Sequence, residues 1–485
     1  MAYLGTNTTV IQKPRILINT GVDLVTNICR IEVINKLIIC EKMKLSRYFT
    51  ISLILFFSFS FTCFAQGNWK EFTKDNDPST PRGTANTTFE DNQNNFWVGT
   101  NMGLFMFNGS KWKRFKKKDG LKGVNVTKFV QDSKGTIWIG TNKGLSTYKD
   151  GKLTAKKQRI KLSLKLSEMT NTFPINYISN IYKDSKENLW FGTGLKRSTP
   201  FLYSTGILVK YDGENCIYMN KTKMNGHPII DIKEDNDGYM WVASGWECID
   251  CTGRVYTGHL AKYKDGKWES YIDQIPYSGD WIINKIYKDK SGNLWFSAIS
   301  NNNAGCVIKY DGKEMRFFTK NNGLLNYVNI YFEDSNGVLW LGGQRGLAYS
   351  TNDKFRFLRN ISNEIIDLSV KTIREDSKKN IWVGTSRGIY VYTSEGSWKQ
   401  FNIENGLSGD SNNTLRIRED FEGKMWVLNR GKRVKYYISK INPDDWSVET
   451  ISPDNFIEHM PYVMVETSNK DMWFIANGHV LKYSE

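Results

Sequence analysis

The chain has few residues of the types that most enzyme active sites need. Its 485 residues include only four histidines, at His227, His259, His459 and His479. None of them belongs to an HExxH motif, and the sequence contains no GxSxG, phosphate-binding-loop or kinase motif. These absences argue against zinc-protease, serine-hydrolase and nucleotide chemistry, so we expect a binding protein rather than an enzyme, with no cofactor.

Cysteine is also scarce, and this excludes a disulfide-stapled scaffold. Of seven cysteines, four lie after residue 66: Cys216, Cys248, Cys251 and Cys306. Cys248-Ile249-Asp250-Cys251 is a CxxC, but no second CxxC or histidine pair stands at the spacing of a zinc site. A local disulfide that stiffens a loop is the favoured interpretation, and a metal site is the alternative. We expect no metal site elsewhere.

One long apolar run exists, and it lies near the start. A basic segment at residues 43–47 precedes the run Ile51 to Phe61, and Cys63-Phe64-Ala65 offers small residues for signal peptidase. This layout predicts a secretory signal peptide at residues 43–65 rather than a permanent membrane span. Translation is then expected to start at Met43, with residues 1–42 an untranslated or disordered extension. The protein is expected to be periplasmic or secreted.

The charge balance is basic. The whole chain has a formal net charge of +16, and removal of residues 1–66 takes away seven basic and three acidic residues, leaving +12. For an exported protein this favours anionic glycans or an acidic surface over nucleic acid. A soluble surface rich in lysine is the alternative.

Nine copies of one short pattern, each centred on a tryptophan, organise the rest of the chain. Clear copies read FWVGT at residues 96–100, IWIGT at 137–141 and IWVGT at 381–385. The spacings between successive tryptophans are 41, 52, 51, 54, 45, 42, 44 and 47 residues. A period in this range is typical of one four-stranded propeller blade. The anchor tryptophans are Trp97, Trp138, Trp190, Trp241, Trp295, Trp340, Trp382, Trp426 and Trp473.

Each repeat also carries turn residues at fixed distances from its tryptophan. An aspartate stands six residues before it in eight copies, and Thr467 replaces the aspartate in the ninth. Glycine follows three residues later in five copies. Asp-x-x-Gly is hairpin-turn chemistry between an inner strand A and a strand B that holds the tryptophan. A second glycine begins strand C, and another turn leads to the outer strand D. We interpret the tryptophans and aspartates as structural.

The two ends of the repeat region complement each other. The last copy contains strands A, B and C but stops before strand D, whereas Gly67-Asn68-Trp69-Lys70-Glu71-Phe72 resembles an unattached strand D. The sequence therefore predicts an all-β fold: a single β-propeller at residues 66–485, with about nine four-stranded blades and the last blade completed by the N-terminal strand. Closure in this way removes exposed sheet edges.

The repeat resembles the two-component regulator propeller repeat, whose pattern is D-x-x-G-x-[IL]-W-[VI]-G-T followed by N-x-G-[LI]. The resemblance recurs nine times and covers residues 67–485. It implies the periplasmic sensor propeller of bacterial hybrid two-component receptors, many of which detect oligosaccharides. This sequence shows no C-terminal membrane helix, no linking β-sandwich and no kinase motif, so kinase activity is not carried over. A separate signalling protein is a conceivable partner.

Departures from the repeat are expected to carry the function. Three consecutive copies lengthen the loop between strands B and C, by ten residues after Trp190, eleven after Trp241 and four after Trp295. These loops fall on one face of a propeller. Aromatic side chains suit sugar rings and basic ones suit carboxylates or sulfates. The predicted ligand-binding residues are Lys196, Arg197, Phe201, Tyr203, Trp246, Tyr256, His259, Trp281, Arg345, Arg387 and Arg430.

We therefore expect an exported, sensor-type propeller. Its ligand is expected to be an oligosaccharide, either neutral or acidic, or a protein partner, bound on the face with the long loops of blades 3 to 5. The alternatives are a propeller polysaccharide lyase, for which His259 with Tyr256 and Arg254 is the one candidate cluster, and a structural protein-interaction scaffold. In a further alternative, the inserts pack on one another and the arginines are simply solvated.

Overall fold

The computed structural model divides the chain into two units, Met1–Gln66 and Gly67–Glu485, and all of the residues that it describes belong to the second. The described residues are 68–156, 177–194, 197–198, 206–219, 227–248, 255–271, 274–275, 281–300, 305–319, 328–343, 346–351, 354–358, 360–361, 364–365, 369–409, 411–432, 435–451, 463–476 and 478–484. The predicted signal peptide lies outside these residues. In the described parts of the chain, no helix has the length and apolarity that a bilayer span requires.

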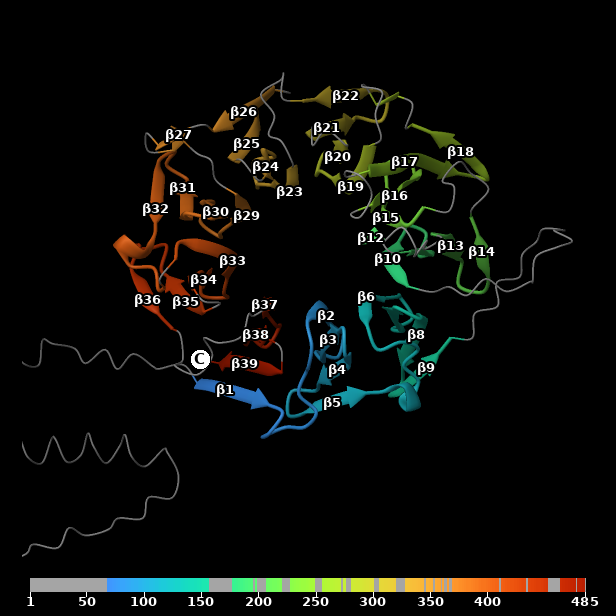
Figure 1. Ribbon diagram of the computed structural model, residues 1–485, viewed down its shortest axis with the longest axis horizontal. Helices are drawn as coiled ribbons and strands as arrows, with labels where there is room; N and C mark the ends of the chain where they lie inside the picture. Colours follow the sequence, from blue (N-terminus) through green and yellow to red (C-terminus); the bar gives the residue numbers. More distant parts are fainter. Residues whose placement is uncertain are drawn as a thin grey trace, which may run out of the picture. The chain divides into compact units, whose positions relative to one another are not determined.

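Nine antiparallel four-stranded units, blades 1 to 9 in the order of their tryptophans, form a ring (Figure 1). The predicted nine-bladed propeller is therefore confirmed. The innermost strands A are β2 (Ala85–Glu90), β6 (Val126–Gln131), β10 (Ile178–Lys183), β15 (Ile229–Glu234), β19 (Trp281–Lys288), β23 (Val328–Glu333), β29 (Val370–Glu375), β33 (Asn413–Glu419) and β37 (Val463–Glu466). Strands B are β3 (Phe96–Thr100), β7 (Ile137–Thr141), β11 (Leu189–Thr193), β16 (Met240–Cys248), β20 (Leu294–Ser300), β24 (Leu339–Gly343), β30 (Ile381–Thr385), β34 (Met425–Arg430) and β38 (Met472–Ala476).

Strands C and D complete each blade toward the outside of the ring. Strands C are β4 (Gly103–Phe107), β8 (Gly144–Lys149), β13 (Leu208–Tyr211), β17 (Val255–Lys264), β21 (Gly305–Tyr310), β25 (Gly346–Thr351), β31 (Gly388–Tyr392), β35 (Tyr436–Ile441) and β39 (His479–Ser484). Strands D are β5 (Trp112–Phe115), β9 (Lys152–Ala155), β14 (Cys216–Tyr218), β18 (Lys267–Ser270), β22 (Met315–Phe318), β26 (Lys354–Leu358), β32 (Trp398–Phe401), β36 (Val448–Thr450) and β1 (Asn68–Thr73). Outside the blades, β12 (Arg197–Ser198), β27 (Asn360–Ile361), β28 (Glu364–Ile365) and the short 3-10 helices η1 (Lys117–Asp119) and η4 (Ile403–Asn405) occupy connections.

The ring closes as the sequence predicted. β1 pairs antiparallel with β39 over six residue pairs, from Asn68 opposite Ser484 to Thr73 opposite His479. Blade 9 thus combines the N-terminal strand with the last three strands of the chain. This pairing covers the outer edge of β39, which would otherwise be an exposed template for aggregation.

The hydrophobic core lies between adjacent blades, and the anchor tryptophans are its centre. Each anchor ring is at most 5% exposed and meets an aromatic ring of the following blade, at centroid distances from 4.7 to 6.1 Å. Trp97, for example, contacts Tyr148, and Trp473 contacts Phe107 across the closing junction. The structural interpretation of the tryptophans is confirmed, since a buried aromatic ring removes 150–250 Å² from water.

The repeated aspartate has two roles, and the sequence predicted only the first. One carboxylate oxygen accepts from the backbone within the A–B turn, as Asp91 does from the amides of Gln93 and Asn95. The other oxygen accepts from the indole Nε1 of the anchor, with N–O distances of 2.7–2.9 Å in blades 1 to 8. The position three residues before the anchor has positive φ in all nine turns, which explains the glycines there.

Blade 9 lacks this aspartate, and its tryptophan shows the consequence. Among the described residues, Trp473 Nε1 has no hydrogen-bond acceptor, although the ring is 1% exposed. We expect Thr467→Asp to raise the free energy of unfolding by about 1 kcal/mol, because a buried donor gains its partner. Denaturant unfolding would measure the change. Thr467→Asn, whose amide nitrogen would face the indole in place of a carboxylate oxygen, is the control and should give a smaller gain. A Thr467→Asp protein no more stable than the parent would contradict the prediction.

A second set of bonds links neighbouring blades through a glutamate that stands seven positions before the anchor in six of the nine blades. Glu234 accepts from the amide and the hydroxyl of Ser185 at 2.6 and 2.8 Å, and Glu90 accepts from the amide of Ser468 at 2.9 Å across the closing junction. Glu333, Glu375, Glu419 and Glu466 accept in the same way from the turn of the preceding blade. These carboxylates fix the spacing of the blades on one side of the ring.

Candidate functional site

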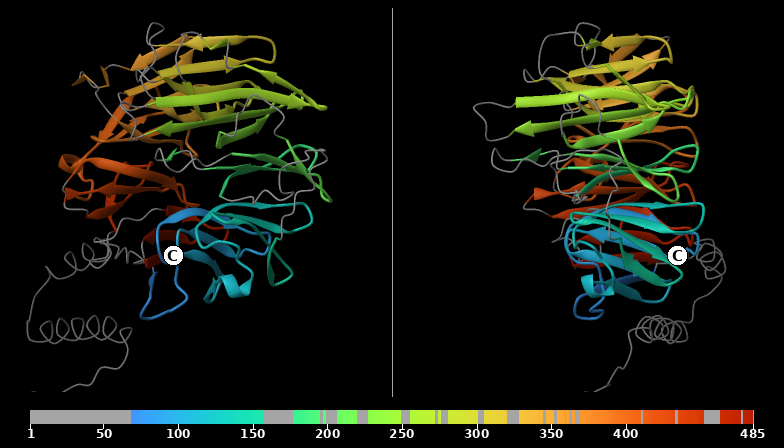
Figure 2. Two further views of the ribbon diagram at one scale, coloured as in Figure 1. Left: turned by 45° about the vertical axis from the view of Figure 1, so that its right-hand side comes forward. Right: turned by 90° about the vertical axis from the view of Figure 1, so that its right-hand side faces the viewer.

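The B–C turns and the D-to-A crossings lie on one face of the ring, called the B–C face. The A–B and C–D turns lie on the opposite, A–B face. The most extended structure on the B–C face is the hairpin of blade 4, in which β16 and β17 pair continuously from Met240 opposite Tyr263 to Cys248 opposite Val255. The strands of blades 4 and 5 project beyond the others on this side (Figure 2). Strand C of this blade begins before the glycine of the repeat pattern, Gly258, because residues 255–257 continue the pairing.

The insertion after Trp190 joins this hairpin. β12 lies parallel to the end of β16, with Arg197 opposite Glu247 and Ser198 opposite Cys248. Glu247 is in turn opposite Tyr256 on β17, so these positions lie side by side on three adjacent strands. An addition from blade 3 thus becomes the fifth strand of the blade 4 sheet. The backbone pairing places Arg197 beside Glu247, the residue after Trp246, and Glu247 opposite Tyr256.

The remaining predicted site residues fall in different surroundings. Arg387, in the B–C turn of blade 7, and Arg430, at the end of β34, are exposed. Trp281 is 5% exposed and belongs to the core between blades 4 and 5, so its ring does not face solvent. Lys196, Phe201, Tyr203 and Arg345 lie outside the described residues, as do Cys251 and Arg254.

His259 faces a second histidine that the sequence analysis did not place near it. The rings of His227 and His259 meet edge to face with their centroids 5.0 Å apart. Burial and the neighbouring His259 lower the pKa of His227 to about 4, so its imidazole is neutral near pH 7. Within the described ranges, no three His, Cys, Asp or Glu side chains gather as a metal-ligand group.

The innermost strands carry a basic cluster that the sequence analysis missed. Arg374 on β29 lies near Arg416 and Arg418 on β33, and partial burial together with the charges of Arg418 and Arg416 lowers the pKa of Arg374. The sequence does carry a signal for this cluster, in the residues at three fixed positions on strand A: eight, ten and eleven residues before each anchor. These positions hold seven basic residues and one acidic residue, Asp231; the basic residues are Lys128, Lys233, Lys285, Lys371, Arg374, Arg416 and Arg418.

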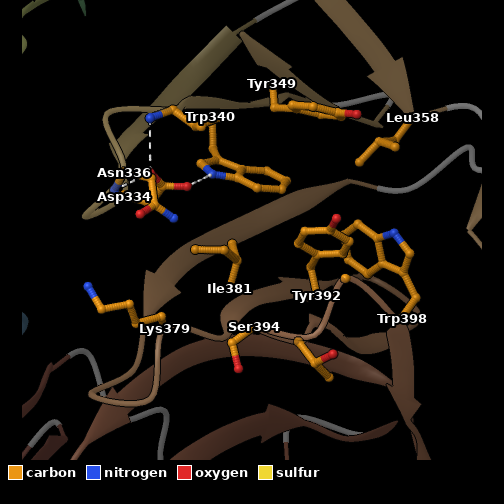
Figure 3. Close-up of a pocket in the computed structure, with 13 residues that line it drawn as sticks. Asp334, Asn336, Trp340, Tyr349, Leu358, Lys379, Ile381, Tyr392, Ser394 and Trp398 are labelled. Atoms are coloured by element: carbon orange, nitrogen blue, oxygen red, sulfur yellow. Dashed lines mark hydrogen bonds between the residues drawn. The ribbon is translucent and has the colours of Figure 1, made fainter. Parts of the chain in front are cut away.

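A pocket lies between blades 6 and 7 toward the A–B face (Figure 3). Its volume is about 340 Å³. Trp340 and Tyr349 of blade 6 form one wall, and Tyr392 and Trp398 of blade 7 form the other. Asn336, Lys379 and Ser394 from the turns stand at one end. This pocket was not predicted from the sequence.

The fold and the repeat geometry define a nine-bladed propeller whose blades share one tryptophan-anchored turn. Three segments, residues 120–143, 172–194 and 364–387, match the family described as two component regulator propeller. The resemblance stated from the sequence is therefore confirmed in these three segments, which match the two-component regulator propeller repeat. No curated protein matches the chain.

Several solved structures are similar to this chain over much of its length. The extracellular domain of the hybrid two component system BT4673 from B. thetaiotaomicron is 16% identical, with a TM-score of 0.31, over 81% of this chain and 58% of that domain. The corresponding domain of BT3049 from the same species is 18% identical, with a TM-score of 0.26, over 85% of this chain and 63% of that one. Virginiamycin B lyase from Staphylococcus aureus is 14% identical, with a TM-score of 0.35, over 63% of this chain and 94% of the lyase. The chain thus spans under two thirds of the length of the two sensor domains.

Proposed function

We propose that this protein is an exported ligand-binding propeller of the sensor type, which recognises an acidic oligosaccharide on its B–C face. The observation that carries the proposal is that the insertions of blades 3 and 4 belong to the same β-sheet. Because β12 of blade 3 pairs with β16 of blade 4, the lengthened segments build one continuous surface there. Additions that merely extended separate loops would have no reason to share a sheet.

The charges on and near this face support an anionic ligand. Lys143, Arg387 and Arg430 are exposed at B–C turns or at the end of strand B, in blades 2, 7 and 8. The innermost strands add Arg374 and Arg418, which lie close to one another. Crowded guanidinium groups repel one another, and a carboxylate or sulfate bound between them would relieve this repulsion.

Charge reversal on the two sides of the ring tests the proposal. The Arg387→Glu/Arg430→Glu double variant should bind a polyuronate or a sulfated glycosaminoglycan about tenfold more weakly, since two lost ion pairs amount to roughly 1–2 kcal/mol. The matched control is Lys149→Glu/Lys313→Glu, which makes the same change in net charge at exposed C–D turns of the A–B face. Titration calorimetry measures the affinities of the parent and both double variants. Dextran serves as the neutral glycan for comparison.

Binding of the acidic glycans should weaken with added salt, because exposed charges are screened. Equal losses in both double variants would mean that only net charge matters, and this result would remove the proposed face. Failure of the parent to bind any of the glycans would overturn the glycan assignment in favour of a protein partner, such as a separate signalling protein.

A further inference from the structure

The pocket between blades 6 and 7 has the form of a slot between two aromatic layers. On one side Trp340 and Tyr349 stack with centroids 5.1 Å apart and an interplanar angle of 28°. On the other side Tyr392 and Trp398 lie 5.1 Å apart at 45°, with Ile381 beside them (Figure 3). The volume of about 340 Å³ is within the range of small-molecule sites. A flat ring could therefore enter between the two blades.

One wall of the slot is aromatic because of the residue on strand C that stands opposite the anchor tryptophan. In blades 3, 4, 5, 8 and 9 the residue opposite the anchor tryptophan is a lysine, whose ammonium lies 5.3–5.8 Å from the centroid of the tryptophan ring. The lysine covers the ring in those blades. In blade 6 the opposite residue is Tyr349, which presents an aromatic face instead.

The other wall is formed by Tyr392 and Trp398 of blade 7. Tyr392 contacts Trp340 at 6.1 Å, as a tyrosine of the next blade contacts the anchor ring at 4.7–5.9 Å in five other junctions. It packs more closely against Trp398 of its own blade, at 5.1 Å. The slot thus lies in a junction that keeps the aromatic contact between the blades and that has Tyr349 where five other blades have lysine.

The charged groups around the slot already have hydrogen-bond partners. The Asp334 carboxylate accepts from Trp340 Nε1 and from the backbone amides of Asn336 and Val338, each at 2.9 Å. Lys379 Nζ donates to Ser335 Oγ at 2.8 Å, and that hydroxyl donates to Glu375 at 2.7 Å. Asp334 and Lys379 are the charged residues among those that line the slot, and their charges are opposite, so a neutral ligand suits it better than an ionic one.

Two polar side chains at the mouth remain available to a ligand. Among the described residues, the side-chain amide of Asn336 and the hydroxyl of Ser394 have no hydrogen-bond partner, and both residues line the slot (Figure 3). An amide and a hydroxyl can donate to and accept from sugar hydroxyls. The apolar C–H faces of a pyranose suit the aromatic walls, as its hydroxyl edge suits this mouth.

We propose that the slot between blades 6 and 7 binds the pyranose ring of a neutral sugar. The site lies toward the face opposite the proposed acidic-glycan surface and does not depend on it. A single sugar ring has few atoms, so its dissociation constant should be on the order of 1 mM. The ring lies against the aromatic side chains that line the slot, with its hydroxyls toward Asn336 and Ser394.

The test is saturation-transfer NMR on the full chain. It measures the binding of neutral methyl glycosides of glucose, galactose, mannose and N-acetylglucosamine. Tyr349→Lys gives blade 6 the residue found in five other blades, so the fold should be kept while the ring is covered. Affinity for the bound glycoside should fall at least tenfold. Trp398→Ala, which removes part of the second wall, should also weaken binding. The matched control is Lys210→Tyr in blade 3, which should leave binding unchanged.

Several outcomes would overturn the proposal. They are the absence of saturation transfer to every neutral glycoside, equal binding by the parent, Tyr349→Lys and Trp398→Ala proteins, and binding of indole in place of the glycosides. Circular dichroism melting of each variant separates loss of binding from unfolding. The Arg387→Glu/Arg430→Glu variant should keep neutral-glycoside binding, so the failure of either proposal is visible independently of the other.

Discussion

Replacing Trp241 with alanine is expected to lower the free energy of unfolding by about 3–5 kcal/mol, the range for a large aromatic side chain lost from a core. The Trp241 ring is 0% exposed and contacts Phe296 at 5.2 Å and Tyr310 at 4.8 Å in blade 5. Its Nε1 donates to Asp235 at 2.8 Å. The alanine would therefore leave a cavity between two blades and an aspartate without its indole donor.

Trp241→Phe separates these two effects. Phenylalanine keeps most of the buried ring but cannot donate to Asp235, so a loss of roughly 1–2 kcal/mol is expected. Denaturant unfolding followed by far-ultraviolet circular dichroism measures both variants. A loss below about 1 kcal/mol for Trp241→Ala would show that neighbouring side chains collapse into the cavity, and the anchors would then not be the main support of the junctions.

The fold was predictable because its signals are local. Strand alternation, the Asp-x-x-Gly turn and the tryptophan are all contained within one repeat, and nine copies confirm one another. The missing outer strand of the last repeat and the spare strand before the first predicted that these two ends pair, and the structure shows the register, with Trp69 opposite Tyr483. The carboxylate links between blades were not predicted, since they join residues 40–49 positions apart in different repeats and, for Ser468 and Glu90, 378 positions apart.

The candidate sites were only partly predictable, for a related reason. Loop lengths located the insertions that build the blade 4 hairpin and its added strand. They could not show that Trp281 turns into the core, because burial depends on how blades 4 and 5 meet. The slot depends on Tyr349 standing opposite Trp340, and that register became visible only in the paired strands.

The largest effect is expected from disruption of the closing strand β1. Trp69 contacts Tyr483 at 5.1 Å and Phe474 at 5.7 Å, in the core between blades 8 and 9. Phe72 contacts Trp473 at 6.0 Å and Phe107 at 5.6 Å, in the core between blades 9 and 1. The two side chains serve different junctions, so their losses should add. Trp69→Ala/Phe72→Ala should lower the free energy of unfolding by about 5–8 kcal/mol.

Loss of this strand should also change the association state. Without β1, the outer edge of β39 is free to pair with another chain, and oligomers or aggregates are expected. Light scattering after size exclusion would detect them, and denaturant unfolding would measure the stability. Lys70→Ala, an exposed position on the same strand, should change stability by less than about 1 kcal/mol.

A peptide containing residues 67–74, added to a chain shortened to begin after Thr73, provides the decisive comparison. It should restore the monomer, because it can re-form the six residue pairs with β39 as an added strand. A shortened chain that stays monomeric and as stable as the parent without the peptide would show that eight complete blades and three strands close the ring unaided. The pairing of β1 with β39 would then be a consequence of closure rather than its cause.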